Sequence, residues 1–297
     1  MGGSDNQSKG KQVILISGAT GRVGTSASLA LQKQGIAFRA LMRDRAKFAL
    51  QDSADVEIVE GDFQNEASLR SAMAGVTRAL LVTGNGPDQA SNEHNFATIA
   101  AESGVQHLVK VSSLEAADDA TTILPKMHFA SEQYIESLGL DWTFLRPNFF
   151  MQNLLLYAGS IANAGLFALP LGDAKAALID ARDVGEIAAK ALSEDGHGNK
   201  IYRLNGPELL TFGEVAARMS KALGKSVKYV DQSPEDFRAT LMQFVPSEQQ
   251  VDAICGVFSE IAKGVLEELT PTAKDVLGRE PRSIEQFTKD FAAAFSA

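Results

Sequence analysis

A glycine-rich turn follows directly after the first apolar run of the chain, and this pairing restricts the fold more than any other feature. The run is Val13–Ser17, and the turn reads Gly18-Ala19-Thr20-Gly21-Arg22-Val23-Gly24. Gly18 permits the tight turn out of a strand, Gly21 lets backbone amides approach a pyrophosphate, and Gly24 lets a helix pack closely on a sheet. A strand, a glycine turn and a helix in this order predict the start of a dinucleotide-binding βαβ unit.

The rest of the first half alternates short apolar runs with helix-like segments. Strands are predicted where nearly every position is apolar: Val13–Ser17, Phe38–Met42, Val56–Val59, Ala79–Thr83, Leu108–Ser112 and Thr143–Leu145. Helices are predicted between them, at Val23–Gln34, Ala67–Ala74, Glu93–Glu102 and Phe129–Ser137. Strands that are apolar on both faces and alternate with helices are typical of a parallel sheet covered on two sides. The predicted fold class is therefore α/β, with a Rossmann-type, doubly wound parallel sheet.

After Pro147 the pattern becomes mixed. Short strands are predicted at Ala177–Asp180, Ile201–Asn205 and Val227–Val230, and helices at Val184–Leu192, Thr211–Leu223, Gln249–Leu269 and Ile284–Phe295. Three parts follow: a disordered tail (1–11), an NAD(P)-binding core (12–150), and a smaller mixed C-terminal substrate region (151–297). We expect the last part to pack on the core and to contribute strands back to it. The long helix predicted at 249–269 either docks against the core, which is the simpler reading, or forms a mobile lid.

The residues after the second predicted strand indicate which dinucleotide is bound. An acidic residue at this point accepts the ribose hydroxyls of NAD(H), whereas a guanidinium binds the 2′-phosphate of NADP(H). Arg43 stands at the discriminating position, with Lys47 one turn further on and Arg22 on the glycine turn. Asp44 keeps NAD(H) open as the less favoured alternative. The sequence therefore predicts NADP(H).

Further cofactor contacts are expected where the other strands end, because ligands of open α/β sheets bind at the carboxyl edge. Asp62 and Phe63 follow the third strand and suit an adenine ring, while Thr83, Gly84 and Asn85 follow the fourth and suit the inner ribose and nicotinamide. The full set of expected cofactor contacts is Gly18, Thr20, Gly21, Arg22, Val23, Gly24, Arg43, Lys47, Asp62, Phe63, Thr83, Gly84, Asn85, Ser112, Pro147, Asn148 and Phe149.

These residues together resemble the NmrA-like family of atypical short-chain dehydrogenases, from Val13 onward. The resemblance is carried by the glycine turn, Met42-Arg43-Asp44 with Lys47, Val111-Ser112-Ser113, and the segments 142–153, 179–184 and 202–208. The family contains NADPH-dependent reductases of quinones, azo dyes and triphenylmethane dyes, and also redox-sensing regulators that bind dinucleotide without turnover. The resemblance therefore implies the fold and the cofactor, and it leaves the substrate open.

Conventional short-chain dehydrogenases use Tyr-x-x-x-Lys as their proton donor, and none of the four tyrosines here has a lysine four residues later. The helix after Val111-Ser112-Ser113 instead carries His128, with Glu132 on the same helical face to orient the imidazole. In one hypothesis His128 donates a proton, with Lys126 and Ser112 as auxiliaries. In another the acceptor is so electrophilic that solvent supplies the proton. His128 can also be purely structural.

The substrate pocket is expected after Arg146-Pro147, where aromatic residues alternate with amides. The candidates Phe150, Asn153 and Tyr157 suit a flat, conjugated substrate. Asp180 or Asp183 is expected to cap the next helix, and Arg182 is expected to form a local ion pair, rather than to act in catalysis.

Composition excludes several classes of partner. The net charge of −9 argues against direct nucleic-acid binding, and the single Cys255 excludes a disulfide framework. The histidines lack metal-ligand spacing, so we predict no metal, and no apolar run is long enough to span a membrane. We expect a cytoplasmic monomer or homodimer that acts on a small molecule.

The leading hypothesis is an NADPH-dependent oxidoreductase that transfers hydride to a quinone-like, dye-like or enone acceptor. The alternative is a non-catalytic, redox-sensing regulator that binds NAD(P) and acts through a protein partner. An open aromatic pocket would favour the enzyme, and a pocket filled by side chains would favour the sensor. An epimerase or dehydratase is disfavoured because Tyr-x-x-x-Lys is missing.

Overall fold

The computed structural model describes residues 13–48 and 50–296, so the predicted tail at residues 1–11 lies outside the described part. Within that part, seven parallel strands form one sheet in the order β3-β2-β1-β4-β5-β6-β9. They are β1 (Ile14–Ile16), β2 (Phe38–Met42), β3 (Val56–Glu60), β4 (Arg78–Leu81), β5 (His107–Val111), β6 (Asp141–Pro147) and β9 (Lys200–Leu204). The predicted doubly wound parallel sheet is confirmed.

The order of the strands creates the site where a ligand can bind. From β1 the chain builds outward through β2 and β3, and then returns to place β4 on the other side of β1. This reversal opens a crevice beyond the carboxyl ends of β1 and β4, which is where ligands bind in doubly wound sheets. The glycine turn leaves β1 at that point.

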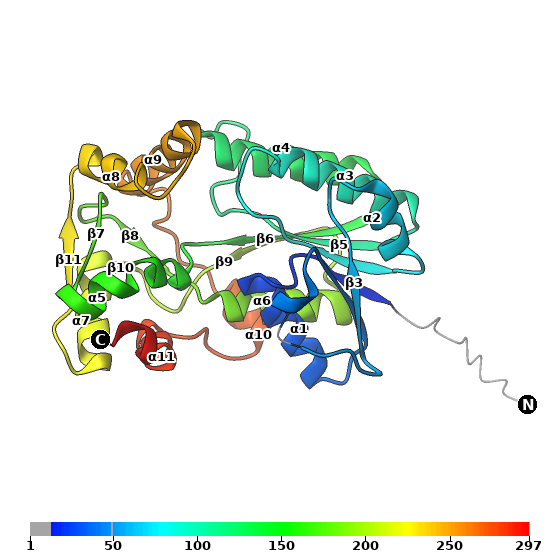
Figure 1. Cartoon of the computed structure of the whole chain (residues 1–297), viewed down its shortest axis with the longest axis horizontal. Helices are drawn as coiled ribbons and strands as arrows, with labels where there is room; N and C mark the ends of the chain where they lie inside the picture. Colours follow the sequence, from blue (N-terminus) through cyan, green and yellow to red (C-terminus); the bar gives the residue numbers. More distant parts are fainter. Residues whose placement is uncertain (1–12, 49, 297) are drawn as a thin grey trace, which may run out of the picture.

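Helices cover both faces of the sheet (Figure 1). One face carries α1 (Arg22–Lys33), α6 (Ala181–Ser193) and α10 (Thr272–Leu277), and the other carries α2 (Glu66–Met73), α3 (Gln89–Glu102) and α4 (Ile123–Ser137). A separate hydrophobic cluster forms under each layer because the strands are apolar on both sides. Helices α1 and α6 approach closely at Gly185, where a Cβ would stand 2.4 Å from the Cβ of Ser26.

The other elements of the second half gather beyond the end of the sheet to which β6 and β9 run (Figure 1). They are η2 (Met151–Tyr157), α5 (Ala158–Ala164), β7 (Leu166–Leu169), β8 (Lys175–Ala176), β10 (Leu210–Thr211), α7 (Phe212–Leu223), β11 (Lys228–Asp231), α8 (Pro234–Leu241), α9 (Glu248–Ala262), α11 (Ile284–Asp290) and η3 (Ala292–Phe295). Strands β7 and β11 pair in parallel, and β8 and β10 pair antiparallel. Phe167, Phe212 and Phe287 lie in the hydrophobic cluster that these elements enclose.

One predicted strand of the second half is wrong. Instead of a strand over Ala177–Asp180, the chain forms β8 at Lys175–Ala176 and then a single bridge between Ile179 and Phe150. Pairing cannot continue beyond the bridge, because Asp180 already caps α6 by accepting a hydrogen bond from the amide of Arg182. The predicted capping role of Asp180 is confirmed, and Thr211 begins α7 in a capping box with Glu214.

Two late helices are shorter than predicted. The helix expected over Gln249–Leu269 ends at Ala262, because Gly264 takes φ +91° just after the helix and turns the chain away. The helix expected over Ile284–Phe295 divides into α11 and η3. Among the described residues, no helix has both the length and the apolar character that crossing a membrane requires.

Candidate functional site

Two adjoining cavities lie along the carboxyl edge of the sheet, with volumes of about 540 and 640 Å³. The first, the β2 cavity, is lined by Arg43, Asp62 and Phe63; the second, the aromatic cavity, is lined by Phe149 and Phe150. Both volumes lie within the range of about 300–1,000 Å³ that is typical of ligand pockets. The cavities form one continuous groove, because they share the residues Gly18, Thr20, Val82, Thr83, Gly84 and Asn85.

Most of the predicted site residues line this groove. They are Gly18, Thr20, Gly21, Arg22, Val23, Arg43, Asp62, Phe63, Thr83, Gly84, Asn85, Ser112, His128, Pro147, Asn148, Phe149, Phe150 and Asn153. Four others do not line it: Gly24, Lys47, Lys126 and Tyr157. Lys126 is exposed on α4, and Tyr157 packs toward Phe167, where burial raises the pKa of its hydroxyl to about 12.

The glycine turn has the backbone geometry that a phosphate group requires. Gly18 has φ +57°, and a Cβ there would stand 2.8 Å from the carbonyl oxygen of Val82. A Cβ at Gly24 would stand 2.2 Å from the carbonyl oxygen of Gly18, so this glycine allows α1 to begin close against the turn. Gly21 precedes the helix in extended conformation. The first amides of α1 therefore face the groove without intrahelical acceptors and can bind an anion.

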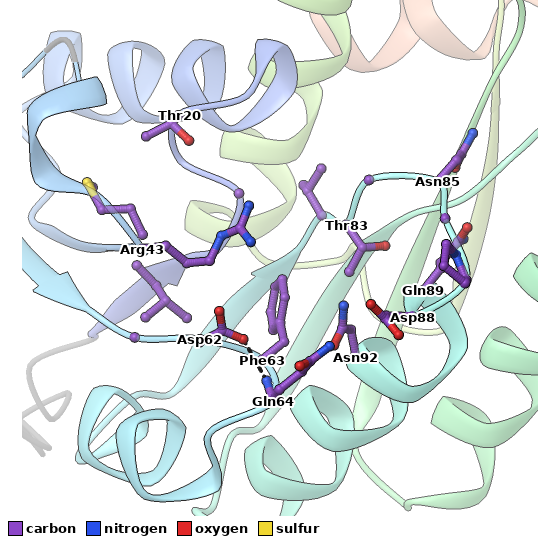
Figure 2. A pocket seen from close by; sticks show the side chains of 18 residues that line it. Thr20, Arg43, Asp62, Phe63, Gln64, Thr83, Asn85, Asp88, Gln89 and Asn92 are labelled. Atoms are coloured by element: carbon purple, nitrogen blue, oxygen red, sulfur yellow. Dashed lines mark hydrogen bonds between the residues drawn. The ribbon is translucent and has the colours of Figure 1, made fainter. Parts of the chain in front are cut away.

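Arg43 is the cation that the β2 cavity presents at the end of β2 (Figure 2). Its neighbours are engaged elsewhere: Arg45 of η1 (Arg45–Lys47) pairs with Asp52, and Lys47 lies 3.7 Å from Asp44. Asp44 also caps η1 by accepting from the amide of Ala46. Among the described residues, no ion pair occupies the guanidinium of Arg43. A phosphate group in this cavity would meet that guanidinium before any carboxylate from the same turn.

Asp62 and Phe63 face Arg43 across the β2 cavity, after the end of β3 (Figure 2). One carboxylate oxygen of Asp62 accepts from the amide of Gln64 at 2.9 Å, which holds the side chain in a tight turn. The ring of Phe63 stands edge-on to Phe96 with centroids 5.4 Å apart. A cation, a carboxylate and a ring on three sides suit the adenosine end of a dinucleotide.

The aromatic cavity has apolar walls and few polar groups. Phe149 and Phe150 come from the turn after β6, and α9 adds Ile254, Val257 and Phe258 from the opposite side. The ring of Phe258 lies 6.3 Å from that of Phe149. Helix α9 therefore packs on the hydrophobic cluster of the second half and also walls the cavity.

A buried hydroxyl group marks where a ligand would bind. The Oγ atom of Ser112 is buried in the cavity wall after β5 and has no hydrogen-bond partner among the described residues, whereas the hydroxyl of Ser113 interacts with the carboxyl group of Glu115. An unpaired buried hydroxyl is unfavourable, so a polar group of a bound ligand would satisfy it. The side chain of Asn148 already has partners: its Oδ1 accepts from the backbone N–H of Phe149, and its Nδ2 donates to the carbonyl oxygen of Leu266. These residues fit a nicotinamide dinucleotide.

His128 lies in the wall of the aromatic cavity, but its neighbour is not the predicted one. The carboxylate of Glu132 binds the guanidinium of Arg146 on β6, with Nε donating to Oε1 at 3.0 Å. Instead, Nζ of Lys110 on β5 lies 2.9 Å from Nδ1 of His128. The predicted pairing of Glu132 with His128 is therefore wrong, because the guanidinium can engage both carboxylate oxygens at once.

Four charged side chains surround His128, and all are buried. Lys110 is fully buried, Glu93 and Glu132 are each 1% exposed, and Arg146 is 9% exposed. Nζ of Lys110 lies 3.2 Å from Oε2 of Glu93. Two cations and two carboxylates balance only while His128 is neutral. Burial, followed by the charges of Lys110 and Arg146, lowers the pKa of His128 well below its usual value.

Reasoning from the sequence missed Lys110, Glu93 and Gln89. Lys110 lies inside an apolar strand, where a charged residue is uncommon unless it has a buried partner. Burial lowers the pKa of Lys110, while Glu93 and Glu132 oppose this effect. Gln89 lies against the imidazole, with its Nε2 at 3.2 and 3.4 Å from the two ring nitrogens. The lysine in the strand was the one signal that could have revealed the cluster.

The parallel sheet, the reversal at β1 and β4, and the glycine turn over the groove together define a Rossmann-type protein that binds NAD(P)(H). The chain belongs to the NmrA-like family, whose sequence profile matches residues 10–288.

Three proteins illustrate what the chain is similar to. It is 35% identical to an NAD(P)H azoreductase of Xenophilus azovorans, over 96% of this chain and 100% of the relative. It is 33% identical to a (4-alkanoyl-5-oxo-2,5-dihydrofuran-3-yl)methyl phosphate reductase of Streptomyces griseus, over 96% and 99%. The crystal structure of an NADPH-dependent quinone oxidoreductase from Escherichia coli, complexed with NADPH, matches with a TM-score of 0.85 at 27% identity, over 95% of this chain and 100% of that one.

Proposed function

We propose that the chain is an NADPH-dependent reductase that transfers hydride to a conjugated, electrophilic small molecule such as a quinone, a dye or an enone. The chain is an NAD(P)H-dependent oxidoreductase, like the relatives that it matches along nearly their whole length. One observation supports a conjugated acceptor. The aromatic cavity joins the β2 cavity at Thr83, Gly84 and Asn85, so a flat acceptor can lie beside a bound cofactor.

The preference for NADPH over NADH rests on Arg43. Its guanidinium lines the β2 cavity without an ion pair among the described residues, whereas Asp44 is occupied by its own helix cap and by Lys47. A guanidinium binds a phosphate dianion with paired, charge-assisted hydrogen bonds, and a nearby carboxylate would repel it. We place the dinucleotide on residues 12–150 and the acceptor between this core and residues 151–297.

The chain contributes positioning and exclusion of water. A bound reduced nicotinamide supplies the hydride; Phe149, Phe150 and Phe258 form apolar walls that hold a conjugated acceptor and keep water from its ring. His128 is neutral at physiological pH, so it has no imidazolium proton to give directly. A quinone needs no proton from His128, because its reduced form can take protons from solvent.

The competing function is a redox sensor that binds the dinucleotide without turnover. A sensor needs no cavity for an acceptor, yet the aromatic cavity of about 640 Å³ lies beside the β2 cavity and is walled by three phenylalanine rings. This cavity favours the enzyme over the regulator.

The test is NADPH consumption by the purified protein against quinones, azo dyes, triarylmethane dyes, enones and simple aldehydes. We expect turnover with at least one conjugated class and none with simple aldehydes. In Phe258→Leu, a shorter wall should raise the KM for the acceptor while the Kd for NADPH stays unchanged. The matched control is Phe244→Leu, because Phe244 is 77% exposed and lies outside both cavities. NADPH binding without any turnover would contradict the proposal and favour the sensor.

A further inference from the structure

The buried polar cluster beside the aromatic cavity contains more charged and titratable side chains than packing alone requires. Lys110, Glu93 and His128 come from β5, α3 and α4, and all three side chains are removed from solvent. Burying an ion pair in a core usually gives no more stability than apolar residues of the same size would. Such a cluster next to a ligand cavity therefore calls for a chemical explanation.

The contacts form a continuous path from the cavity and back to it. His128 lines the aromatic cavity, and its Nδ1 lies 2.9 Å from Nζ of Lys110. Nζ lies 3.2 Å from Glu93, whose other oxygen accepts from the hydroxyl of Thr83 at 2.6 Å. Thr83 stands in the β4–α3 loop, on the wall shared by both cavities (Figure 2). Thr83 and Glu93 form a hydrogen bond, and the other two contacts bring the polar atoms within 3.2 Å of each other.

The tautomer of His128 depends on the charge of Lys110. In its ammonium form Lys110 can only donate a hydrogen bond, so Nδ1 then accepts from Nζ and the ring proton sits on Nε2. The amide of Gln89 lies at nearly equal distances from both ring nitrogens, so it cannot make a straight hydrogen bond to both. The imidazole thus holds a proton on one side and receives another from the opposite side.

We propose that Lys110 is the proton reservoir of the reaction and that it delivers its proton through His128 to an acceptor that cannot draw one from solvent. In the transfer, the Nε2–H bond of His128 breaks and the proton joins the oxygen or carbon of the acceptor that has received the hydride. At the same time Nδ1 takes a proton from Nζ, so His128 stays neutral and Lys110 becomes an uncharged amine. The cycle closes when Nδ1 returns its proton to the amine of Lys110 while Nε2 takes a proton from water that enters the aromatic cavity as the product leaves. This inference rests on the proposed function and names the proton donor for its enone acceptors.

The charges around Lys110 suit this role. Burial favours the neutral amine of Lys110 and so lowers its pKa. The negative charges of Glu93 and of Glu132, which pairs with Arg146, favour the ammonium form. Doubly protonated His128 would add a third cation to a buried cluster that holds only two carboxylates. Proton transfer through a neutral imidazole avoids that state, because one proton enters as another leaves.

Kinetics with two acceptor classes test the relay. Lys110→Met should lower kcat/KM for an enone by about 100-fold, which is within the range of general-acid catalysis, and should change quinone reduction by less than about 3-fold. Lys110→Met combined with Glu93→Gln removes both charges and should behave alike, even if the single variant unfolds. Lys221→Met is the control, because Lys221 is exposed on α7 and lies outside the groove. His128→Gln added to Lys110→Met should cause no further loss, since the two residues act as a unit.

A spectroscopic readout on the free protein is independent of turnover. Nitrogen NMR of the histidine rings should show His128 neutral at pH 6 with its proton on Nε2, and Lys110→Met should change this tautomer signature. A proton on Nδ1, or equal losses for enone and quinone in both Lys110 variants, would overturn the relay. So would a loss confined to Glu115→Gln, since Glu115 lines the aromatic cavity and burial raises the pKa of its carboxyl group.

The outcomes also separate this inference from the proposed function. The relay would be overturned, and the proposed reductase would stand, if Lys110→Met reduced enones as fast as the natural sequence does. The same would follow if the natural sequence reduced quinones and no enone. No NADPH consumption with any acceptor class would overturn the proposed function, and the relay with it.

Discussion

On the proposed preference for NADPH, replacing Arg43 with alanine should leave a protein that scarcely distinguishes the two dinucleotides. The side chain lines the β2 cavity and lacks an ion pair among the described residues, so the variant removes the proposed phosphate contact without leaving a buried carboxylate unpaired. Charge-assisted hydrogen bonds contribute about 1.5–3 kcal/mol, and the exposure of Arg43 places it near the lower end. A loss of about 1.5–2 kcal/mol corresponds to a rise of about 10- to 30-fold in the Kd for NADPH.

The Kd for NADH should change by less than about 3-fold, because that molecule has no 2′-phosphate. Binding is measured by fluorescence titration at low and at moderate salt, and the NADPH advantage of the natural sequence should shrink as salt rises. Arg45→Ala is the matched control: it removes the same charge two residues away, from a guanidinium that pairs with Asp52 and does not line the cavity. Equal losses for both dinucleotides in Arg43→Ala, or the same loss in Arg45→Ala, would refute the phosphate assignment.

Two further predictions concern the fold and the glycine turn. Burial, followed by the charge of Arg78, lowers the pKa of His107 from 6.5 to about 4; the unfolded chain therefore binds a proton between these values that the folded chain does not. The free energy of unfolding should fall by up to about 3 kcal/mol as the pH drops from 6.5 to 4, and denaturation of His107→Gln should lack this part of the slope. Gly24→Ala should reduce stability by about 1–3 kcal/mol and weaken NADPH and NADH alike, because its Cβ would collide with the turn, whereas Gly159→Ala, whose Cβ meets open space, should do neither. Selective loss of one dinucleotide in Gly24→Ala would show that the turn does not act through the shared pyrophosphate.

The features that depend on neighbouring residues could be predicted from the sequence alone. The glycine turn is one, since a strand, the φ +57° of Gly18 and the start of α1 occupy one short segment. The parallel sheet is another, because apolar strands alternating with helices leave few other folds available. Arg43 could be placed for the same reason: it follows a strand whose end lies at the carboxyl edge.

The partners of His128 depended on the tertiary structure. Helical spacing correctly placed Glu132 on the face of α4 that turns inward, but it could not show that Arg146 of β6 lies beneath and takes the carboxylate. Lys110 and Gln89 come to the imidazole from β5 and α3 only because both elements pack against α4. A sequence determines local conformation through neighbours a few residues apart, whereas the choice among competing charged partners is made by the packing of distant segments. In this protein the proposed cofactor site depends on residues close together in the sequence, and the charged cluster around His128 depends on the packing of distant segments.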